Sequence, residues 1–128
     1  GLADRIAIDS AGTGHRRVGD PPDPRAIAAA EARGYDLGTL RGRQLRQDDF
    51  KAFDLLLAMD RGHFDHMVDR VSGDGADRIR MFLELSPETG LISVPDPYSG
   101  DATDYERALD LIETGTEAWL EQIRNLIG

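Results

Sequence analysis

The chain has 128 residues, a formal net charge of −9, and 40% hydrophobic and 30% charged residues, a composition typical of one globular domain. Its acidity argues against nucleic acids and anionic membrane surfaces as partners, and no apolar run approaches the length of a membrane span. There is no cysteine, which excludes disulfides and thiolate metal sites within these residues, and a cytoplasmic location is the default expectation.

The first part of the chain combines one predicted strand with one predicted helix. Residues 5–10 alternate polar and apolar side chains, which predicts a short strand. Residues 11–22 are rich in glycine, proline and charge and form a predicted loop. A helix is predicted over residues 25–33, with Asp23 as its N-cap and Gly34 as the residue that ends it.

The rest of the chain alternates strands and helices. The expected elements are a short helix at 48–52, an apolar strand within 53–59 that is buried on both faces, a helix at 60–71, a strand at 78–85, a long loop at 86–102, and a helix from a capping box at Thr103 and Glu106 to about residue 127. This order predicts an α/β domain with a small parallel sheet in which three strands are visible. Ligands of such sheets bind beyond the carboxyl ends of the strands.

The long loop contains Val94-Pro95-Asp96-Pro97-Tyr98. Each proline fixes its own φ and restricts the residue before it, so Asp96 is held on a stiff, non-helical segment. A carboxylic acid held beside an aromatic ring suits proton transfer to a leaving group. The alternative is a turn in which the carboxylate only caps a nearby backbone N–H.

Five segments in the same order resemble low-molecular-weight protein tyrosine phosphatases. They are residues 9–13 (Asp-Ser-Ala-Gly-Thr), 19–26, 41–44, 53–60 and 95–98 (Pro-Asp-Pro-Tyr), followed by a C-terminal helix. Each match is weak alone, but together they extend along nearly the whole chain.

The resemblance implies a three-layer α/β/α fold with four parallel strands. It also implies a Cys-x5-Arg phosphate loop whose thiolate attacks the phosphorus of phosphotyrosine, with Asp96 as the general acid and base. The substrate would be a phosphotyrosine protein or a small aryl phosphate. No metal or organic cofactor is implied, because the phosphate loop itself supplies the positive field.

The chain departs from the resembled family at its nucleophile. It contains no cysteine, and it begins where the family has already passed its first strand, phosphate loop and first helix. We therefore expect residues 1–128 to form one phosphatase-like domain that lacks its N-terminal strand, loop and helix. The intact protein is expected to be an enzyme, whereas the 128 residues alone are expected to be inactive.

Other side chains receive roles from the same resemblance. Tyr98 corresponds to an aromatic residue that lines the cleft over the substrate ring. Arg16 stands where many bacterial relatives carry a large aromatic residue, and an arginine there can stack on the substrate ring and attract acidic peptide flanks. The alternative for both is an ordinary surface position. Ser10 and Asp60 correspond to residues that support the phosphate loop through hydrogen bonds. His63 and His66 are three residues apart on a predicted helix, but no third ligand is evident and no metal site is predicted.

Two other functions remain open from the sequence. A non-catalytic relative that binds phosphorylated or regulatory partners is slightly favoured by the missing N-terminal segment and by Leu40, which stands where relatives usually carry histidine. The retained Asp96 argues against it, because a pure binding module needs no proton donor. An arsenate reductase is disfavoured, because that enzyme needs further redox cysteines and normally lacks the acid loop. The sequence does not determine the oligomeric state.

Overall fold

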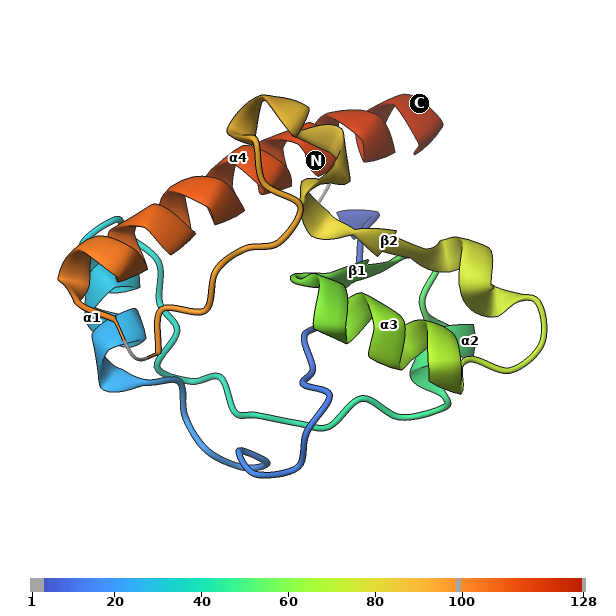
Figure 1. Cartoon of the computed structure of the whole chain (residues 1–128), viewed down its shortest axis with the longest axis horizontal. Helices are drawn as coiled ribbons and strands as arrows, with labels where there is room; N and C mark the ends of the chain where they lie inside the picture. Colours follow the sequence, from blue (N-terminus) through green and yellow to red (C-terminus); the bar gives the residue numbers. More distant parts are fainter. Residues whose placement is uncertain (1–3, 99, 128) are drawn as a thin grey trace.

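Two parallel strands lie at the centre of the fold, with helices against both faces of the pair (Figure 1). The computed structural model describes residues 4–98 and 100–127. The elements are α1 (Pro24–Glu31), α2 (Asp49–Ala52), β1 (Leu56–Ala58), α3 (Arg61–Arg70), β2 (Ile79–Met81) and α4 (Ala102–Ile127), with short 3₁₀ helices at Gly75–Arg78, Phe82–Leu85 and Pro87–Thr89. None of these helices is long and apolar enough to cross a lipid bilayer.

The side chains of β1 enter two separate apolar clusters. Leu56 and Ala58 are buried with residues of α2, α3 and β2, namely Phe50, Met67 and Ile79. Leu55, Leu57 and Met59 instead pack against the cluster of Phe82, Leu83, Val94, Ala108 and Trp119, which includes one face of α4. The expected strand is therefore confirmed, with its Leu56 and Ala58 face buried and its Leu57 face partly buried, and α3 and α4 form the outer layers.

The prediction of a strand at residues 5–10 is wrong for the part of the chain that the structure describes. Residues 6–10 do not pair with another strand, and the Ile8 side chain is 83% exposed. Figure 1 shows this segment as an extended trace beside the rest of the chain. Alternation marks a segment that is able to form a strand, but a strand also needs a neighbour for its N–H and C=O groups. The described sheet therefore has two strands instead of three.

The second half of the predicted strand at 78–85 is a 3₁₀ helix. The backbone N–H of Met81 donates to the Glu84 carboxylate at 2.9 Å. The indole Nε1 of Trp119 donates to the carbonyl of Phe82 at 2.7 Å. These contacts occupy groups that a longer β2 would use in a ladder, so the strand ends at Met81.

Helix α4 begins at Ala102, one residue before the predicted start. The reciprocal cap joins Asp101 and Asp104: each backbone N–H donates to the carboxylate of the other residue, at 3.0 and 3.2 Å. The predicted capping box of Thr103 and Glu106 is therefore wrong. Aspartate is a strong N-cap, and the Glu106 carboxylate pairs with Arg33 instead, at 2.5 Å.

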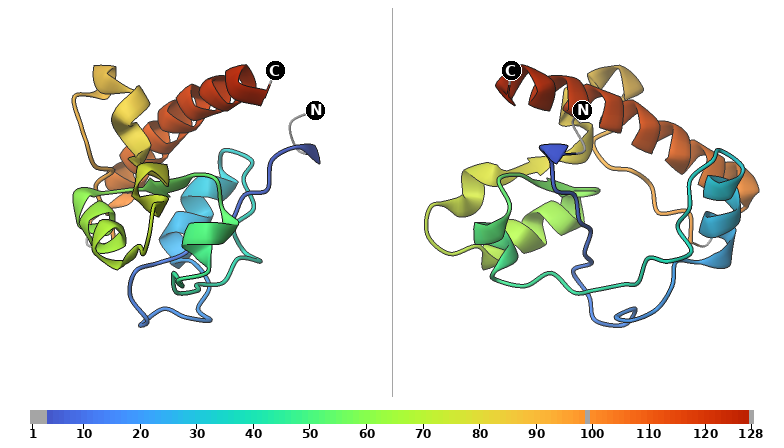
Figure 2. Two further views of the ribbon diagram at one scale, coloured as in Figure 1. Left: turned by 90° about the vertical axis from the view of Figure 1, so that its right-hand side faces the viewer. Right: turned by 180° about the vertical axis from the view of Figure 1, so that it is seen from behind.

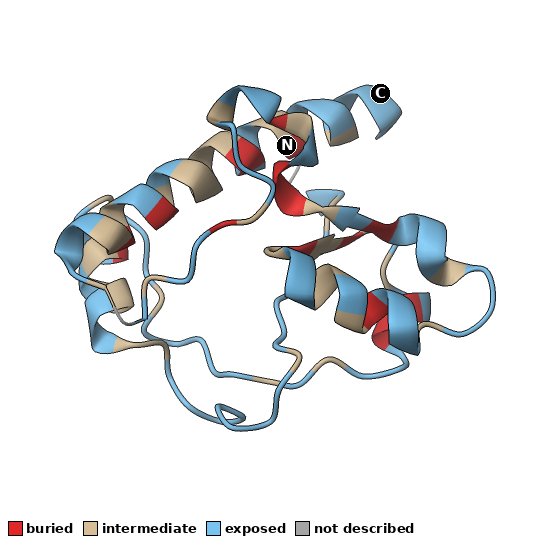
Figure 3. Cartoon of the chain, in the orientation of Figure 1, coloured by how far each residue is buried: buried red, intermediate tan, exposed pale blue. Residues whose placement is uncertain are grey.

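Helix α1 packs on the first half of α4, where Arg33 connects the two helices. The Arg33 guanidinium pairs with Glu106, with Asp110 at 2.9 Å and with Glu113. Figure 2 shows α4 running from this contact to the other end of the molecule. There, Arg5 donates to the carbonyl of Ile127 at 2.6 Å. Among the described residues before α2, only Ala30 is buried. Figure 3 shows most of this part of the chain in the colour of exposed residues.

A buried ion pair fixes α2 to the segment before it. Asp49 is 5% exposed, and its carboxylate accepts hydrogen bonds from Arg43 at 2.9 and 3.1 Å and from the backbone of Arg46 at 2.8 Å. The hydrogen bond from Arg43 lowers the pKa of Asp49 below its ordinary value. The ionised form therefore stabilises the fold.

Replacing Asp49 with asparagine is expected to lower the free energy of unfolding at pH 7 by about 2 kcal/mol, since a hydrogen bond to a charged group is lost. Because the pKa is depressed in the folded state, this contribution is fully present above the unfolded pKa of about 3.9. It is lost as the pH falls through the folded pKa. Urea denaturation at several pH values measures the free energy of unfolding of the wild type and the variant. The difference between these two free energies should become smaller in acid, and a difference that stays constant with pH would contradict this assignment.

The matched control is Asp65→Asn. Asp65 forms an ion pair with Arg61 at 3.2 Å in which both side chains are more than 60% exposed. Such surface pairs contribute about 0.5 kcal/mol or less. This variant should melt almost as the wild type does at every pH.

Candidate active site

A cavity of about 300 Å³ lies where α1, α4, the end of β1 and the loop of residues 94–98 meet. Its polar lining includes Asp60, which directly follows Met59 at the end of β1, and Asp96. The other lining residues come from α1, α4, the loop of residues 94–97 and single positions elsewhere, and apart from His63 and Tyr105 they are apolar. Carboxylates at the edge of an apolar cavity beyond a strand end are the expected arrangement for an α/β active site.

The loop that carries Asp96 leaves the end of the sheet. The backbone N–H of Val94 donates to the carbonyl of Met59 at 2.8 Å, which anchors the start of the loop beside β1. Asp96 is exposed, and its Oδ1 accepts the backbone N–H of Tyr98 at 3.0 Å. No described residue donates a hydrogen bond to Oδ2. The turn interpretation and the acid interpretation are therefore compatible, because one oxygen caps the loop while the other accepts no hydrogen bond from a described residue.

Tyr98 is held between two arginines. Arg17 donates to the Tyr98 hydroxyl at 3.0 Å and lies 5.2 Å from the centre of the ring. Arg25, in the first turn of α1, donates to the Tyr98 carbonyl at 2.5 Å and lies 5.8 Å from the same ring. Even so, the Tyr98 side chain is 54% exposed. An aromatic face is therefore fixed in place beside the Asp96 carboxylate.

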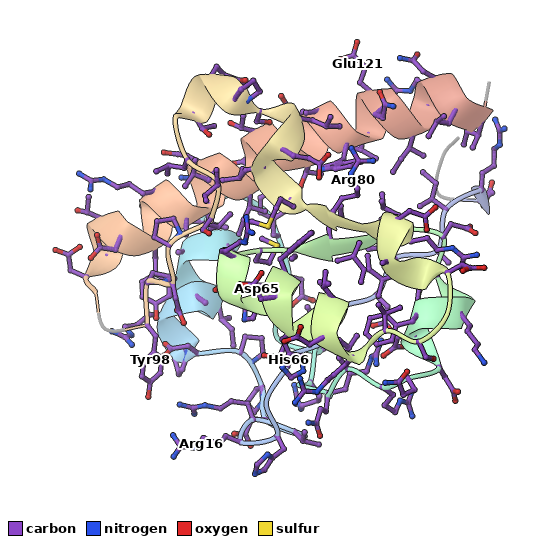
Figure 4. All side chains as sticks on the ribbon, turned by 45° about the vertical axis from the view of Figure 1, so that its right-hand side comes forward. Arg16, Asp65, His66, Arg80, Tyr98 and Glu121 are labelled. Atoms are coloured by element: carbon purple, nitrogen blue, oxygen red, sulfur yellow. The ribbon has the colours of Figure 1, made fainter. Side chains whose placement is uncertain are left out.

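Sequence reasoning selected Arg16 and missed Arg17 and Arg25. Figure 4 shows the Arg16 side chain pointing outward from its loop, apart from Tyr98. The neighbouring Arg17 reaches Tyr98 because backbone hydrogen bonds of 2.8 Å at Gly42 hold the loop. A Cβ on Gly42 would come within 2.2 Å of the Arg17 carbonyl oxygen, so this close approach requires glycine. The contact joins residues far apart in the chain, and no local pattern signals it.

The two residues expected to support a phosphate loop lie in different surroundings. Asp60 lines the cavity and is the N-cap of α3, where its carboxylate accepts the backbone N–H of His63 at 2.7 Å. Ser10 is exposed in the unpaired segment, and its own N–H donates to the Asp9 carboxylate at 2.8 Å. The structure thus brings Asp60 and Asp96 to one cavity, whose lining does not include Ser10 or Arg16.

His63 lies 3.4 Å from the Asp60 carboxylate, measured from its Nδ1. Residues 4–98 and 100–127 contain no group of three or more histidine or carboxylate side chains that is arranged to hold a metal ion. The polar side chains that line the cavity are therefore those of Asp60, His63, Asp96 and Tyr105, whereas Tyr98 and the two arginines beside it lie outside this lining.

Comparison with known proteins gives a consistent result. Residues 1–126 match the family described as Low molecular weight phosphotyrosine protein phosphatase. The chain is 36% identical to the Low molecular weight protein-tyrosine phosphatase A of Mycobacterium tuberculosis over 127 residues, which are 95% of this chain and 76% of that protein. It is 32% identical to the Low molecular weight protein-tyrosine-phosphatase of Streptomyces coelicolor, covering 99% of this chain and 79% of the relative.

A solved structure has the same architecture. The protein tyrosine phosphatase of Entamoeba histolytica, crystallised with Hepes in its active site, superposes with a TM-score of 0.93 at 27% identity, over 97% of this chain and 79% of that one. The small parallel sheet between helical layers is thus the phosphatase fold. The chain therefore belongs to the low molecular weight phosphotyrosine protein phosphatase family, whose enzymes remove phosphate from tyrosine.

Proposed function

We propose that the protein hydrolyses phosphotyrosine in proteins, and also small aryl phosphates, through a cysteinyl-phosphate intermediate with Asp96 as general acid and base. The nucleophile must come from outside these 128 residues, because they include no cysteine. The observation that carries the proposal is the position of Asp96, exposed between two prolines at the edge of a cavity beyond the end of β1.

The proposed reaction has two steps. A thiolate attacks the phosphorus and the bond from phosphorus to the phenolic oxygen breaks, while the Asp96 carboxylic acid gives its proton to that oxygen. The resulting carboxylate then takes a proton from a water molecule that attacks the cysteinyl phosphate. As the oxygen of this water bonds to phosphorus, the bond from phosphorus to sulfur breaks, so inorganic phosphate leaves, the thiolate is regenerated and Asp96 is again protonated.

The remaining roles follow from the same alignment of residues. Tyr98 would line the cleft along the substrate ring, and its fixed, half-exposed ring supports this role. Arg16 would meet acidic flanks of a peptide substrate, which its outward direction supports. Asp60 and Ser10 would support the phosphate loop. The assignment of residues 1–128 to one domain that lacks its first strand, and a cytoplasmic location, stay predictions.

Intact mass spectrometry with a thiol count, made on the protein expressed from its complete gene, is the first test. It should be followed by an assay with phenyl phosphate. We expect at least one reactive thiol and hydrolysis that alkylation of this thiol abolishes. Hydrolysis that is insensitive to alkylation would refute the cysteinyl-phosphate mechanism. A protein with neither a thiol nor activity would favour a non-catalytic binding role.

A further inference from the structure

The loop that carries Asp96 is internally ordered but has few connections to the rest of the fold. Within it, the Tyr98 N–H donates to Asp96 and the Gly100 N–H donates to the Pro97 carbonyl at 2.8 Å. These bonds define the shape of the loop, but they do not determine where it lies relative to the cavity. At its start, the Val94 N–H is anchored to the end of β1. Its far end needs a separate anchor.

Arg25 supplies an anchor at the far end. Its Nη2 donates to the Tyr98 carbonyl at 2.5 Å and its Nη1 donates to the Gly100 carbonyl at 3.1 Å. The guanidinium also lies 5.8 Å from the Tyr98 ring centre and 5.1 Å from that of Tyr105, the first buried residue of α4. One side chain thus contacts the loop, the start of α1 and the start of α4.

The Arg25 side chain is itself held by Asp23, two residues before it. The two Asp23 oxygens accept from Nε at 3.2 Å and from Nη2 at 3.1 Å. Asp23 also accepts the Arg25 backbone N–H at 2.8 Å as the N-cap of α1. Because the guanidinium is planar and its donors are fixed relative to one another, a clamped Arg25 transfers the position of α1 to the loop.

We propose that Arg25 is a positioning residue that fastens the Asp96 loop to the N-terminus of α1 and so sets where the acid meets the leaving group. It touches neither substrate nor the transferred phosphate. This inference rests on the proposed role of Asp96, whose proton transfer depends on placement to within about 1 Å. Arginine stays protonated over the working pH range, so the anchor does not titrate with the acid.

The test compares two substrates in the protein expressed from its complete gene. Phenyl phosphate has a leaving group that needs a proton, whereas dinitrophenyl phosphate has one that does not. The measured quantity is kcat/KM, since it reports the steps up to departure of the leaving group. Arg25→Gln is expected to lower kcat/KM by about 10- to 100-fold for phenyl phosphate. For dinitrophenyl phosphate the loss should be about threefold or less, because no proton transfer is needed.

The matched control is Arg80→Gln. Arg80 also pairs with a carboxylate, that of Glu84, and lies 5.9 Å from an aromatic ring, that of Trp119. Figure 4 shows it on β2, well away from Tyr98. This variant loses the same kinds of contact at another place and should leave the ratio of the two kcat/KM values unchanged.

Two further variants separate positioning from a general structural effect. Arg25→Lys keeps the positive charge but lacks the several N–H donors of the planar guanidinium. Its kcat/KM for phenyl phosphate should therefore lie between those of Arg25→Gln and the wild type. Adding Arg25→Gln to Asp96→Asn should not lower kcat/KM for phenyl phosphate any further relative to dinitrophenyl phosphate, because the acid is already absent. An equal loss on both substrates, or an additive selective loss in the double variant, would overturn the inference.

The outcomes also distinguish this inference from the proposed function. If Asp96→Asn leaves the ratio of the two kcat/KM values unchanged, the assignment of Asp96 as the acid fails. If Asp96→Asn changes the ratio and folded Arg25 variants do not, only the positioning role fails. Amide hydrogen exchange at Tyr98 and Gly100 gives a readout without activity: it should be faster in Arg25→Gln than in Arg80→Gln, and equal rates would count against the anchor.

Discussion

Replacing Asp96 with asparagine is expected to lower kcat/KM for phenyl phosphate by about 100- to 1,000-fold, the usual contribution of a general acid. Asparagine keeps an oxygen that is able to accept the Tyr98 N–H, so the turn at 3.0 Å is retained. It has no acidic proton to give to the leaving phenolate. Steady-state kinetics of the protein from its complete gene, with phenyl phosphate as substrate, measure the loss.

Two comparisons make this prediction specific. In Asp96→Asn, kcat/KM should fall far less for dinitrophenyl phosphate than for phenyl phosphate, because the dinitrophenolate leaves without a proton. Asp96→Ala should behave like Asp96→Asn toward both substrates, although it also removes the cap. If alanine impairs phenyl phosphate hydrolysis and asparagine does not, the cap would be the important feature and Asp96 would not be the acid.

Replacing Trp119 with alanine is expected to lower the free energy of unfolding by about 4 kcal/mol, the range for losing a large buried aromatic side chain. Trp119 is 5% exposed and lies in the cluster between the sheet and α4. Its indole also makes the 2.7 Å hydrogen bond to the Phe82 carbonyl, which the variant leaves without this donor. Urea denaturation followed by circular dichroism measures the change.

Trp119→Phe separates the two contributions. Phenylalanine fills much of the space but has no N–H, so the remaining loss, about 1 to 3 kcal/mol, should reflect the lost hydrogen bond to the Phe82 carbonyl and the smaller ring. Leu126→Ala is the control on the same helix, since this side chain is 74% exposed and should change stability by about 0.5 kcal/mol or less. Equal losses in Trp119→Ala and Leu126→Ala would contradict the described core.

Several elements of the fold were predictable because their signals are local. The apolar run that contains Leu55 and Leu57 predicted a strand buried on both faces, and β1 lies between two clusters. Asp23 and Pro24 predicted the start of α1, where Asp23 caps the helix. The predicted end of this helix was two residues too late, since α1 ends at Glu31 with Ala32 as its C-cap, and Gly34, whose φ is 88°, lies in the turn that follows. These signals act within a few residues, so the sequence displays them.

The errors arose where distant residues compete for the same groups. Residues 5–10 have a strand pattern, but alternation alone provides no pairing partner. Met81 ends β2 because Glu84 accepts its N–H and Trp119 donates to the next carbonyl. Glu106 does not cap α4, because Arg33 binds it from α1. Each outcome depends on a contact that no window of sequence contains.

By itself the sequence determined the family, the α/β class, the stiff loop with Asp96, and the lack of a cysteine nucleophile in these residues. The tertiary structure decided that Asp60 and Asp96 share a cavity, that Arg17 and not Arg16 holds Tyr98, and that Arg25 fastens the acid loop to α1. The physical reason is one of range. Caps, prolines and periodicity act between near neighbours, whereas the position of a guanidinium beside a carbonyl more than seventy residues away follows only from the folded chain.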